Sequence, residues 1–237
     1  MSGNTVLITG GASGIGYSLA KHYIERDNKV LICGRTEEKL VEAKEEHPEI
    51  EYKVCDVADE GDRRSLYRWV EDDFEDMNVL VNNAGVQRNI DLTAGVKDLK
   101  KGDDEIEINL KAPIYLSSQF IPFLEENEDP AIINVSSGLA FSPAPGVPVY
   151  CATKAGLHSY TVSLREQLSE SEIEVYEVIP PLILDTELNE EGRSERGLYE
   201  MDIKAPTSDE FVEAVMKGLE NDEYEIGYGT TEEIPER

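Results

Sequence analysis

The chain has 237 residues, of which 50 are acidic and 22 are basic, so its formal net charge at pH 7 is −28. This excess of negative charge repels phosphate backbones and anionic lipid surfaces, which excludes nucleic acid and membranes as expected partners. Because 40% of the residues are hydrophobic, the chain can fill one sizeable core, and we expect a single domain over residues 1–237.

The cysteines, the histidines and the N-terminal sequence each exclude a class of protein. Cys33, Cys55 and Cys151 are odd in number and widely spaced, unlike a disulfide framework. The N-terminal sequence MSGNTVLITG has no basic region that leads into an apolar run, so we expect no secretory signal, and no apolar run approaches the ~18 residues that span a membrane. The three histidines are scattered, and none stands at metal-ligand spacing with a cysteine. We predict a soluble, cytoplasmic protein with reduced thiols and no metal site.

Short runs rich in β-branched residues alternate with longer segments of helical periodicity. The runs predict buried strands at 4–9, 29–33, 50–54, 78–82, 131–135, 173–179 and 224–228. The longer segments predict helices at about 14–26, 37–46, 60–75, 98–124, 150–170 and 208–220. Thr36 can cap the second helix, and the sequence TSDE at 207–210 is a capping box. This alternation predicts an α/β fold with a doubly wound, parallel, seven-stranded sheet and helices on both faces.

The acidic residues fall in patches between these elements, such as EDDFED and LEENEDP. Patches of this kind usually form solvated helix faces and loop ends. A second interpretation is adaptation to high salt, in which dense surface carboxylate keeps a protein hydrated; composition alone does not separate the two. One polar and weakly patterned stretch, 185–206, is long for a connection, and we predict that it forms a mobile lid on the substrate side.

In an open parallel sheet, ligands bind at the carboxyl ends of the strands, so the residues after each strand are the candidates for chemistry. The first strand is followed by TGGASGIG, which leads directly into a predicted helix. Glycine allows a sharp turn and a close approach of the backbone to a ligand, and the free amides of a helix N-terminus attract phosphate. The spacing is a variant of the dinucleotide-binding fingerprint. The alternative is a plain glycine-rich turn.

The second strand ends at Gly34 and Arg35, where an NAD-binding chain is expected to have an acidic residue for the ribose hydroxyls. A guanidinium can hold a 2′-phosphate through two parallel hydrogen bonds, so Arg35 favours NADP(H) over NAD(H). The alternative is a surface arginine paired with Glu37 or Glu38. After the third strand, Asp56 can accept a hydrogen bond from the adenine amino group. After the fourth, the small residues of NNAG at 82–85 allow a flat ring to lie close to the backbone.

Four sequences together resemble the short-chain dehydrogenase/reductase family. TGGASGIG, NNAG, INVSSG and YCATK occur in the order and spacing of that family over essentially the whole chain. Within the family the chain is most similar to the DltE-like group of bacterial short-chain oxidoreductases. The resemblance implies a single-domain Rossmann fold and a catalytic tetrad of Asn109, Ser137, Tyr150 and Lys154. Ser137 is assigned instead of Ser136 because it lies thirteen residues before Tyr150, as the family pattern requires.

The tetrad residues suit the reduction of a carbonyl, which places negative charge on the carbonyl oxygen. Tyr150 is the expected general acid, although a free phenol titrates near ~10. An ammonium group four residues later on the same helix face, that of Lys154, favours the phenolate and lowers this pKa. The resemblance implies that Ser137 binds the substrate oxygen and that Asn109 holds a water molecule through which Tyr150 is reprotonated.

The resemblance also implies the residues that bind the cofactor. They are Gly10, Ser13, Gly14, Ile15, Gly16, Arg35, Asp56, Val57, Asn83, Ala84, Gly85, Tyr150, Lys154, Pro180 and Thr186. One departure lies after the sixth strand, where Pro181 replaces the family's glycine and Thr186 comes one residue later than usual. Because proline fixes its φ and lacks an amide donor, we expect the contact of this loop with the carboxamide to be rearranged.

The expected function is an NADP(H)-dependent oxidoreductase that interconverts a carbonyl and a secondary alcohol. The alternatives are a non-catalytic dinucleotide-sensing or scaffold protein, which the fold also permits, and a sugar-nucleotide epimerase, which the short C-terminal region disfavours. The expected partners are a small carbonyl or alcohol substrate and further copies of the chain, since the resemblance suggests a homodimer or homotetramer. The apolar residues expected to line the substrate pocket are Leu139, Phe141, Val147, Leu182 and Leu188.

Overall fold

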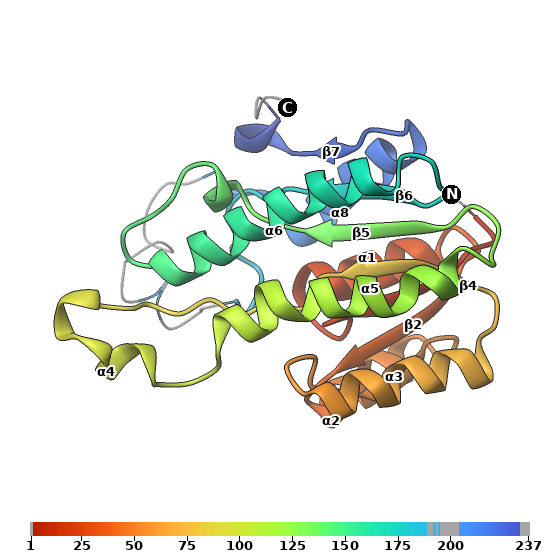
Figure 1. The fold of residues 1–237 in the computed structure, drawn as a ribbon, viewed down its shortest axis with the longest axis horizontal. Coiled ribbons are helices and arrows are strands. Elements are labelled where there is room, and N and C mark those ends of the chain that lie inside the picture. Colours follow the sequence, from red (N-terminus) through yellow and green to blue (C-terminus); the bar gives the residue numbers. More distant parts are fainter. Residues whose placement is uncertain (1, 189–191, 193, 195–203, 233–237) are drawn as a thin grey trace.

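In the computed structural model, seven strands form one parallel sheet in the order β3-β2-β1-β4-β5-β6-β7 (Figure 1). The structure describes residues 2–188, 192, 194 and 204–232. The strands are β1 (Thr5–Thr9), β2 (Lys29–Gly34), β3 (Glu51–Val54), β4 (Met77–Asn82), β5 (Ala131–Val135), β6 (Glu174–Val178) and β7 (Glu225–Ile226). The chain builds outward from β1 to β3 and then returns to the other side of β1, so the strand order switches between β1 and β4. The predicted doubly wound Rossmann fold is thus confirmed.

Helices cover both faces of the sheet (Figure 1). They are α1 (Gly14–Ile24), α2 (Glu37–Glu46), α3 (Glu60–Asp73), α4 (Val96–Leu99), α5 (Ala112–Leu124), α6 (Pro148–Gln167) and α8 (Ser208–Glu220). One face packs against α1, α2 and α8 through apolar side chains such as Leu19, Leu40 and Phe211. The other packs against α3, α5 and α6 through side chains such as Leu66 and Phe120. Within the described residues, no helix has the length and apolar character of a membrane-spanning segment.

The two edges of the sheet depart from the expected buried strands. The central strands β1, β4 and β5 are buried along their whole length, whereas Val54 at the end of β3 is 44% exposed because no strand lies beyond it. On the other edge, β7 has two residues instead of the expected five. The chain leaves the sheet there in a tight turn: a Cβ on Gly227 would lie 2.2 Å from the carbonyl oxygen of Thr231 in the short helix η4 (Gly229–Thr231).

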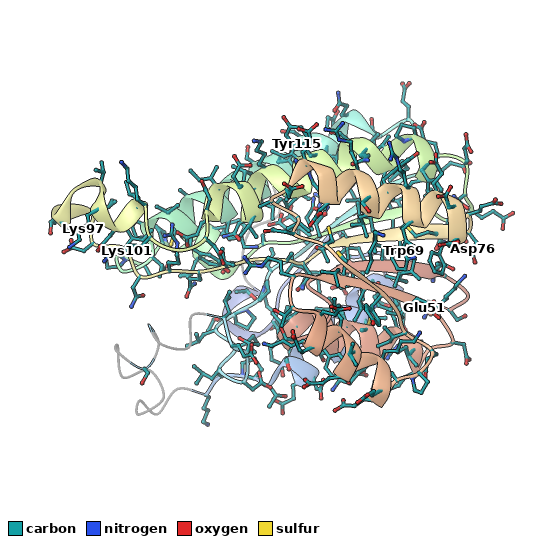
Figure 2. The ribbon with its side chains drawn as sticks, turned by 90° about the horizontal axis from the view of Figure 1, so that it is seen from below. Glu51, Trp69, Asp76, Lys97, Lys101 and Tyr115 are labelled. Carbon is teal, nitrogen blue, oxygen red and sulfur yellow. The ribbon has the colours of Figure 1, made fainter. Side chains whose placement is uncertain are left out.

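The prediction of one long helix over 98–124 is wrong. The segment instead contains α4, an irregular stretch, the π-helical turn η2 (Glu107–Lys111) and α5. Gly102 interrupts the helix with φ of +65°, and the carboxylate of Asp104 then accepts from the amides of Ile106 and Glu107 and so begins a new helix. The short helices η1 (Leu92–Ala94) and α4 consequently lie on a segment that projects from one end of the molecule, where Lys97 is labelled (Figure 2).

Candidate active site

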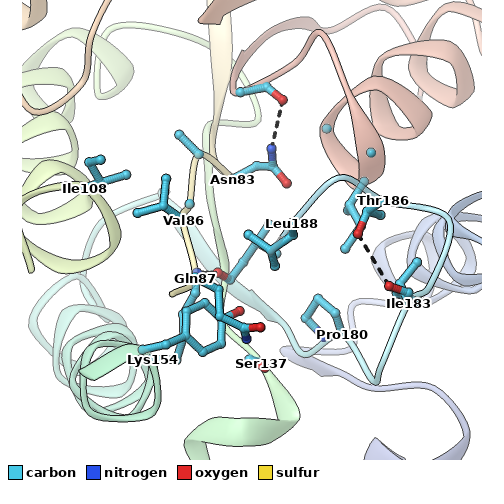
Figure 3. A pocket seen from close by; sticks show the side chains of 18 of the residues that line it. Asn83, Val86, Gln87, Ile108, Ser137, Lys154, Pro180, Ile183, Thr186 and Leu188 are labelled. Carbon is cyan, nitrogen blue, oxygen red and sulfur yellow. Dashed lines mark hydrogen bonds between the residues drawn. The ribbon is translucent and has the colours of Figure 1, made fainter. Parts of the chain in front are cut away.

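A cavity of about 930 Å³ opens at the carboxyl ends of the strands, where ligands are expected in this fold (Figure 3). All the residues predicted to contact the dinucleotide line it, and so do the predicted catalytic residues Ser137, Tyr150 and Lys154. Asn109 is the exception, since it is fully buried behind the cavity wall. The strand ends thus bring together side chains as far apart in the sequence as those of Ser13 and Thr186.

The glycine loop between β1 and α1 forms one wall of this cavity. Gly10 and Gly14 have φ of +66° and +51°, a conformation that favours glycine. A Cβ on Gly16 would lie 2.2 Å from the carbonyl oxygen of Gly10, so only glycine allows the first turn of α1 to pack on the loop. Ser13 is the N-cap of α1, and its side chain makes no capping bond within the described chain. The amides of the first helical turn lie beside the cavity, as phosphate binding requires.

Thr9 joins the glycine loop to the loop after β4. Its Oγ1 accepts hydrogen bonds from the amides of Asn83 and Ala84, both at 3.0 Å, and donates to the carbonyl of Val81 at 3.2 Å. In return, Nδ2 of Asn83 donates to the carbonyls of Thr9 at 2.9 Å and Gly10 at 3.2 Å. These bonds fix two cavity walls relative to each other. This role of Thr9 was not predicted from the sequence, although the residue directly precedes the glycines.

Arg35 lines the cavity but pairs with a residue that the sequence analysis did not consider. Its guanidinium lies 2.9 Å from Asp103, which is 68 positions later in the chain, instead of pairing with Glu37 or Glu38. The hydrogen bond from Arg35 holds the pKa of Asp103 below its usual value. Asp56 lies nearby, and its Oδ1 accepts from the amide of Ala58 at 3.0 Å.

Lys154 is almost completely buried, and its ammonium group donates to the carbonyl of Val135 at the end of β5, at 2.7 Å. Burial lowers the pKa of Lys154 to about 8, and the negative charge of Glu177 opposes this shift. The side chain of Tyr150 lies one helical turn before it on α6, with its ring centroid 5.8 Å from Nζ of Lys154. The sequence prediction that these two residues share one helix face is therefore correct.

Asn109 lies in the π-helical turn η2, and its amide ties the loop after β4 to helix α6. Its Oδ1 accepts from the amide of Val86 at 2.8 Å, while Nδ2 donates to the carbonyl of Val86 at 2.8 Å and to Thr153 at 3.2 Å. A Cβ built on Gly85 would lie 3.4 Å from Oδ1 of Asn109 and 3.6 Å from Nζ of Lys154. Asn109 and Lys154 therefore flank the same glycine, although Asn109 does not line the cavity.

Ser137 follows β5 and caps the short helix η3 (Gly138–Ala140). Its Oγ accepts from the amide of Leu139 at 3.1 Å, which leaves its hydroxyl hydrogen available to a ligand. Ser136 differs, because its hydroxyl donates to the carbonyl of Val178 at 3.4 Å. The assignment of Ser137 over Ser136 is consistent with this geometry.

The loop after β6 reaches the cavity despite Pro181 and the additional residue before Thr186. Thr186 approaches the glycine loop, since its Cγ2 lies 3.2 Å from the position of a Cβ on Gly14. Of the apolar residues predicted for the substrate pocket, Leu139, Phe141, Leu182 and Leu188 line this cavity. The expectation for Val147 is wrong, because this fully buried side chain packs in a small cluster with Tyr150 and Cys151.

Further cavity residues, not predicted from the sequence, lie on the segment after NNAG. Gln87 and Arg88 both line the cavity. Arg88 lies 3.4 Å from the fully buried carboxylate of Glu105, and burial raises the pKa of that carboxyl. The predicted lid over 185–206 falls largely on residues 189–191, 193 and 195–203, outside the described residues. Its described beginning, including Thr186 and Leu188, lines the cavity.

Comparison with known proteins assigns the family. The family model for short chain dehydrogenases matches residues 4–197. The chain is 48% identical over 226 residues to the uncharacterized oxidoreductase DltE of Bacillus subtilis (strain 168), covering 95% of this chain and 88% of that protein. It is 35% identical over 197 residues to the 3-oxoacyl-[acyl-carrier-protein] reductase FabG of Rickettsia conorii, covering 81% and 79%. The chain therefore belongs to the short-chain dehydrogenase family and is similar to DltE.

A solved structure supports the fold assignment. The closed form of a serine dehydrogenase complexed with NADP+ superimposes with a TM-score of 0.85 and covers 98% of both chains, at 24% sequence identity. At this identity the likeness concerns the fold alone. Because the chain belongs to the short-chain dehydrogenase family, it is an oxidoreductase.

Proposed function

We propose that this oxidoreductase uses NADP(H) to interconvert a carbonyl and a secondary alcohol. The observation that carries the proposal is that Ser137, Tyr150 and Lys154 line the same cavity as the glycine loop of 10–16. A protein that only senses a dinucleotide needs the glycine loop but has no need for a hydroxyl, a phenol and a lysine at one point of the wall. The name of the similar FabG protein, a reductase of 3-oxoacyl groups, supports a carbonyl as the reacting group.

The residues around the cavity fit a dinucleotide. The tight glycine loop and the first turn of α1 would hold the pyrophosphate, Asp56 and Val57 the adenine, and Arg35 the 2′-phosphate. Asn83, Ala84, Gly85, Pro180 and Thr186 would enclose the remainder, with Lys154 on the nicotinamide ribose. When bound, the nicotinamide supplies or accepts the hydride.

The protein residues manage the charge and the proton. Ser137 donates a hydrogen bond to the substrate oxygen and Tyr150 donates a proton to it as negative charge develops. The ammonium of Lys154 stabilises the resulting phenolate, and its burial strengthens this attraction because little water screens it. Asn109 holds the segment after β4 and α6 in register, which keeps Lys154 in place.

Three further properties belong to the proposal. NADP(H) is preferred over NAD(H) because a guanidinium, and no acid, follows β2. The enzyme works in the reducing cytoplasm, in agreement with three buried free cysteines, and it assembles as a homodimer or homotetramer, as the family resemblance suggests. The beginning of the segment 185–206 covers the substrate side as a lid.

The test combines a substrate screen with one conservative variant. Purified protein is assayed for NADPH oxidation against a panel of ketones, aldehydes and quinones. Tyr150→Phe removes only one oxygen, so it should retain its fold and NADPH binding while turnover falls by ~10²- to 10⁴-fold, the usual cost of losing a general acid. Lys154→Ala should weaken both turnover and NADPH binding. Full turnover by Tyr150→Phe, or NADPH binding without activity on any carbonyl class, would contradict the proposal and favour the sensing protein.

A further inference from the structure

A row of buried polar side chains crosses the sheet beneath α5 and α6. The strand register places each member opposite the next: Asn82 on β4, Asn134 on β5, Glu177 on β6 and Glu225 on β7. We call these four residues the polar row. Asn82 donates to Asn134 at 2.9 Å, and Asn134 donates to Thr161 of α6 at 3.0 Å. One half of the row is therefore joined by hydrogen bonds between neutral groups, although Oδ1 of Asn82 has no partner in the described chain, and the other half contains two carboxylates.

Two neighbouring carboxylates in a buried place repel each other and lose hydration, so cations or donors must lie beside them. Glu177 is fully buried, and the Glu225 side chain is 5% exposed. Arg165 of α6 lies 3.3 Å from Glu225, and Nδ1 of His158 lies 2.7 Å from Glu177. Phe141, from the loop that lines the cavity, packs edge-on against the ring of His158 at 4.6 Å. His158 thus holds Glu177 in one position.

Lys154, the proposed partner of Tyr150, lies one helical turn from this pair. Lys154 is one turn before His158 on the same face of α6. Its ammonium donates to the carbonyl of Val135, whose register partner on β6 is Val178, the residue after Glu177. The charge of Glu177 opposes the effect of burial on the pKa of Lys154. One face of α6 therefore presents Tyr150, Lys154 and His158 in successive turns, and the last of these binds a carboxylate.

We propose that Glu177, held by His158, is a positioning residue that keeps Lys154 charged and in place beside Tyr150. The inference rests on the proposed function, because only that function requires the ammonium form of Lys154. The charged and titratable groups around Glu177 are Lys154, His158 and Arg165 from α6 and Glu225 from β7, while β5 contributes the neutral amide of Asn134. The reaction site therefore extends one helical turn beyond the tetrad, into the sheet interior.

A divalent-cation site is the competing interpretation of the same cluster. One ligand atom from each of His158, Glu177 and Glu225 lies within 4.8 Å of the others, and within the described chain Oε1 of Glu177 and Oε2 of Glu225 have no hydrogen-bond partner. Charge balance argues against a metal, because Arg165 already lies 3.3 Å from Glu225 and the charge of Lys154 interacts favourably with that of Glu177. A divalent cation would leave excess positive charge in a buried place.

The test measures the titration of Lys154 in the cofactor-free full chain. The rate at which acetic anhydride acetylates Lys154, followed by peptide mass spectrometry over a series of pH values, reports the fraction of neutral amine without turnover. Glu177→Gln should move this titration to lower pH by about one unit, since an attractive charge is lost. The matched control Glu225→Gln should leave it unchanged. His158→Asn should shift it by a smaller amount, because the carboxylate keeps its charge but loses its anchor.

Turnover of a confirmed substrate gives a second readout. The reaction needs the ammonium form of Lys154. As pH rises, the rate of carbonyl reduction by Glu177→Gln should therefore fall at a lower pH than that of the unmodified protein, and the difference should equal the shift in the Lys154 titration. An unchanged Lys154 titration in Glu177→Gln overturns the inference and leaves the proposed function standing. A shifted titration with an unshifted pH–rate profile instead refutes the role of Lys154 in the proposed function.

Two controls complete the design. Thermal melting checks the fold, and if Glu177→Gln does not fold, the titration of His158→Asn decides. Binding of Zn²⁺ by the unmodified chain, lost in both Glu177→Gln and Glu225→Gln, establishes the metal site and overturns the inference.

Discussion

Arg35 interacts with an acidic residue at the place where the proposed function requires it to bind a phosphate. Its guanidinium is 2.9 Å from Asp103, and its side chain lines the cavity and is 45% exposed. A 2′-phosphate carries more negative charge than a carboxylate and offers more acceptor oxygens, so it can share or displace Asp103. The cofactor preference therefore depends on the competition between these two anions.

Substitutions at this pair should move the affinity for NADPH in opposite directions. Arg35→Asp should weaken NADPH binding by about 1.5 to 3 kcal/mol, the contribution of a charged hydrogen bond, or roughly 10- to 150-fold in Kd. NADH binding should be kept or improved, because the new carboxylate can accept from the ribose hydroxyls. Asp103→Asn should tighten NADPH binding by freeing Arg35. Titration of both variants with both cofactors measures these effects.

Either of two results would contradict the proposed role of Arg35 in binding the 2′-phosphate. Tighter binding of NADH than NADPH by the unmodified protein would refute the NADP preference. Equal loss of NADPH and NADH affinity in Arg35→Asp would show that the substitution distorts the site and that the phosphate contact is not what was removed.

Residues that act within a local pattern could be predicted from the sequence, and residues that act through distant partners could not. Gly10, Gly14 and Gly16 were identified because their conformation is needed within one short loop. The pairing of Arg35 with Asp103 was missed, since it joins two loops 68 positions apart. His158 and Glu177 were missed for the same reason: each is an ordinary residue of its own helix or strand, and only the packing of α6 on β6 brings them together.

Helix boundaries could likewise be predicted where local sequence determines them and could not be predicted where tertiary contacts do. The ends of both 37–46 and 208–220 agree with the prediction, because periodicity is local and the capping box at 207–210 marks the start of the second; the predicted cap by the Thr36 side chain is wrong, since it makes no capping bond in the described structure. The segment 98–124 was predicted as one helix, yet it contains the turn η2 that carries Asn109. A π-helical turn leaves no distinct sequence pattern and is stabilised here by the bonds of Asn109 to Val86 and Thr153, which are tertiary contacts.

Two threonine caps allow a matched test of helix stability. Thr207 forms a capping box with Glu210 at the start of α8, whereas Thr36 at the start of α2 makes no side-chain capping bond in the described structure. Thr207→Ala should therefore lower the free energy of unfolding by about 1 kcal/mol, which corresponds to about 2–4 °C in Tm for a domain of this size. Thr36→Ala should change it by less than about 0.5 kcal/mol. Denaturant or thermal unfolding compares them; equal losses would contradict the role of the box.

At the scale of the whole molecule, the surface charge opposes folding. The net charge of −28 repels itself in the compact state, while surface ion pairs such as Lys21–Asp209 and Arg26–Glu213 stabilise it only slightly. Added salt weakens both effects, but the 50 acidic residues outnumber the 22 basic ones so far that repulsion dominates. The balance therefore predicts the sign of the salt dependence without any knowledge of the source.

The melting temperature should accordingly rise with potassium chloride. Screening is nearly complete once the Debye length falls from ~10 Å at 0.1 M to ~3 Å at 1 M, so a merely acidic protein should gain most of its stability below about 0.5 M and then level off. A protein adapted to high salt should continue to gain beyond that point, because its carboxylates organise hydrated cations that simple screening does not involve. An uncharged osmolyte at equal osmolality serves as the control for excluded-solvent effects. A melting temperature that does not change between low and molar potassium chloride would contradict both forms of the hypothesis, since it would mean that the carboxylates do not destabilise the folded chain.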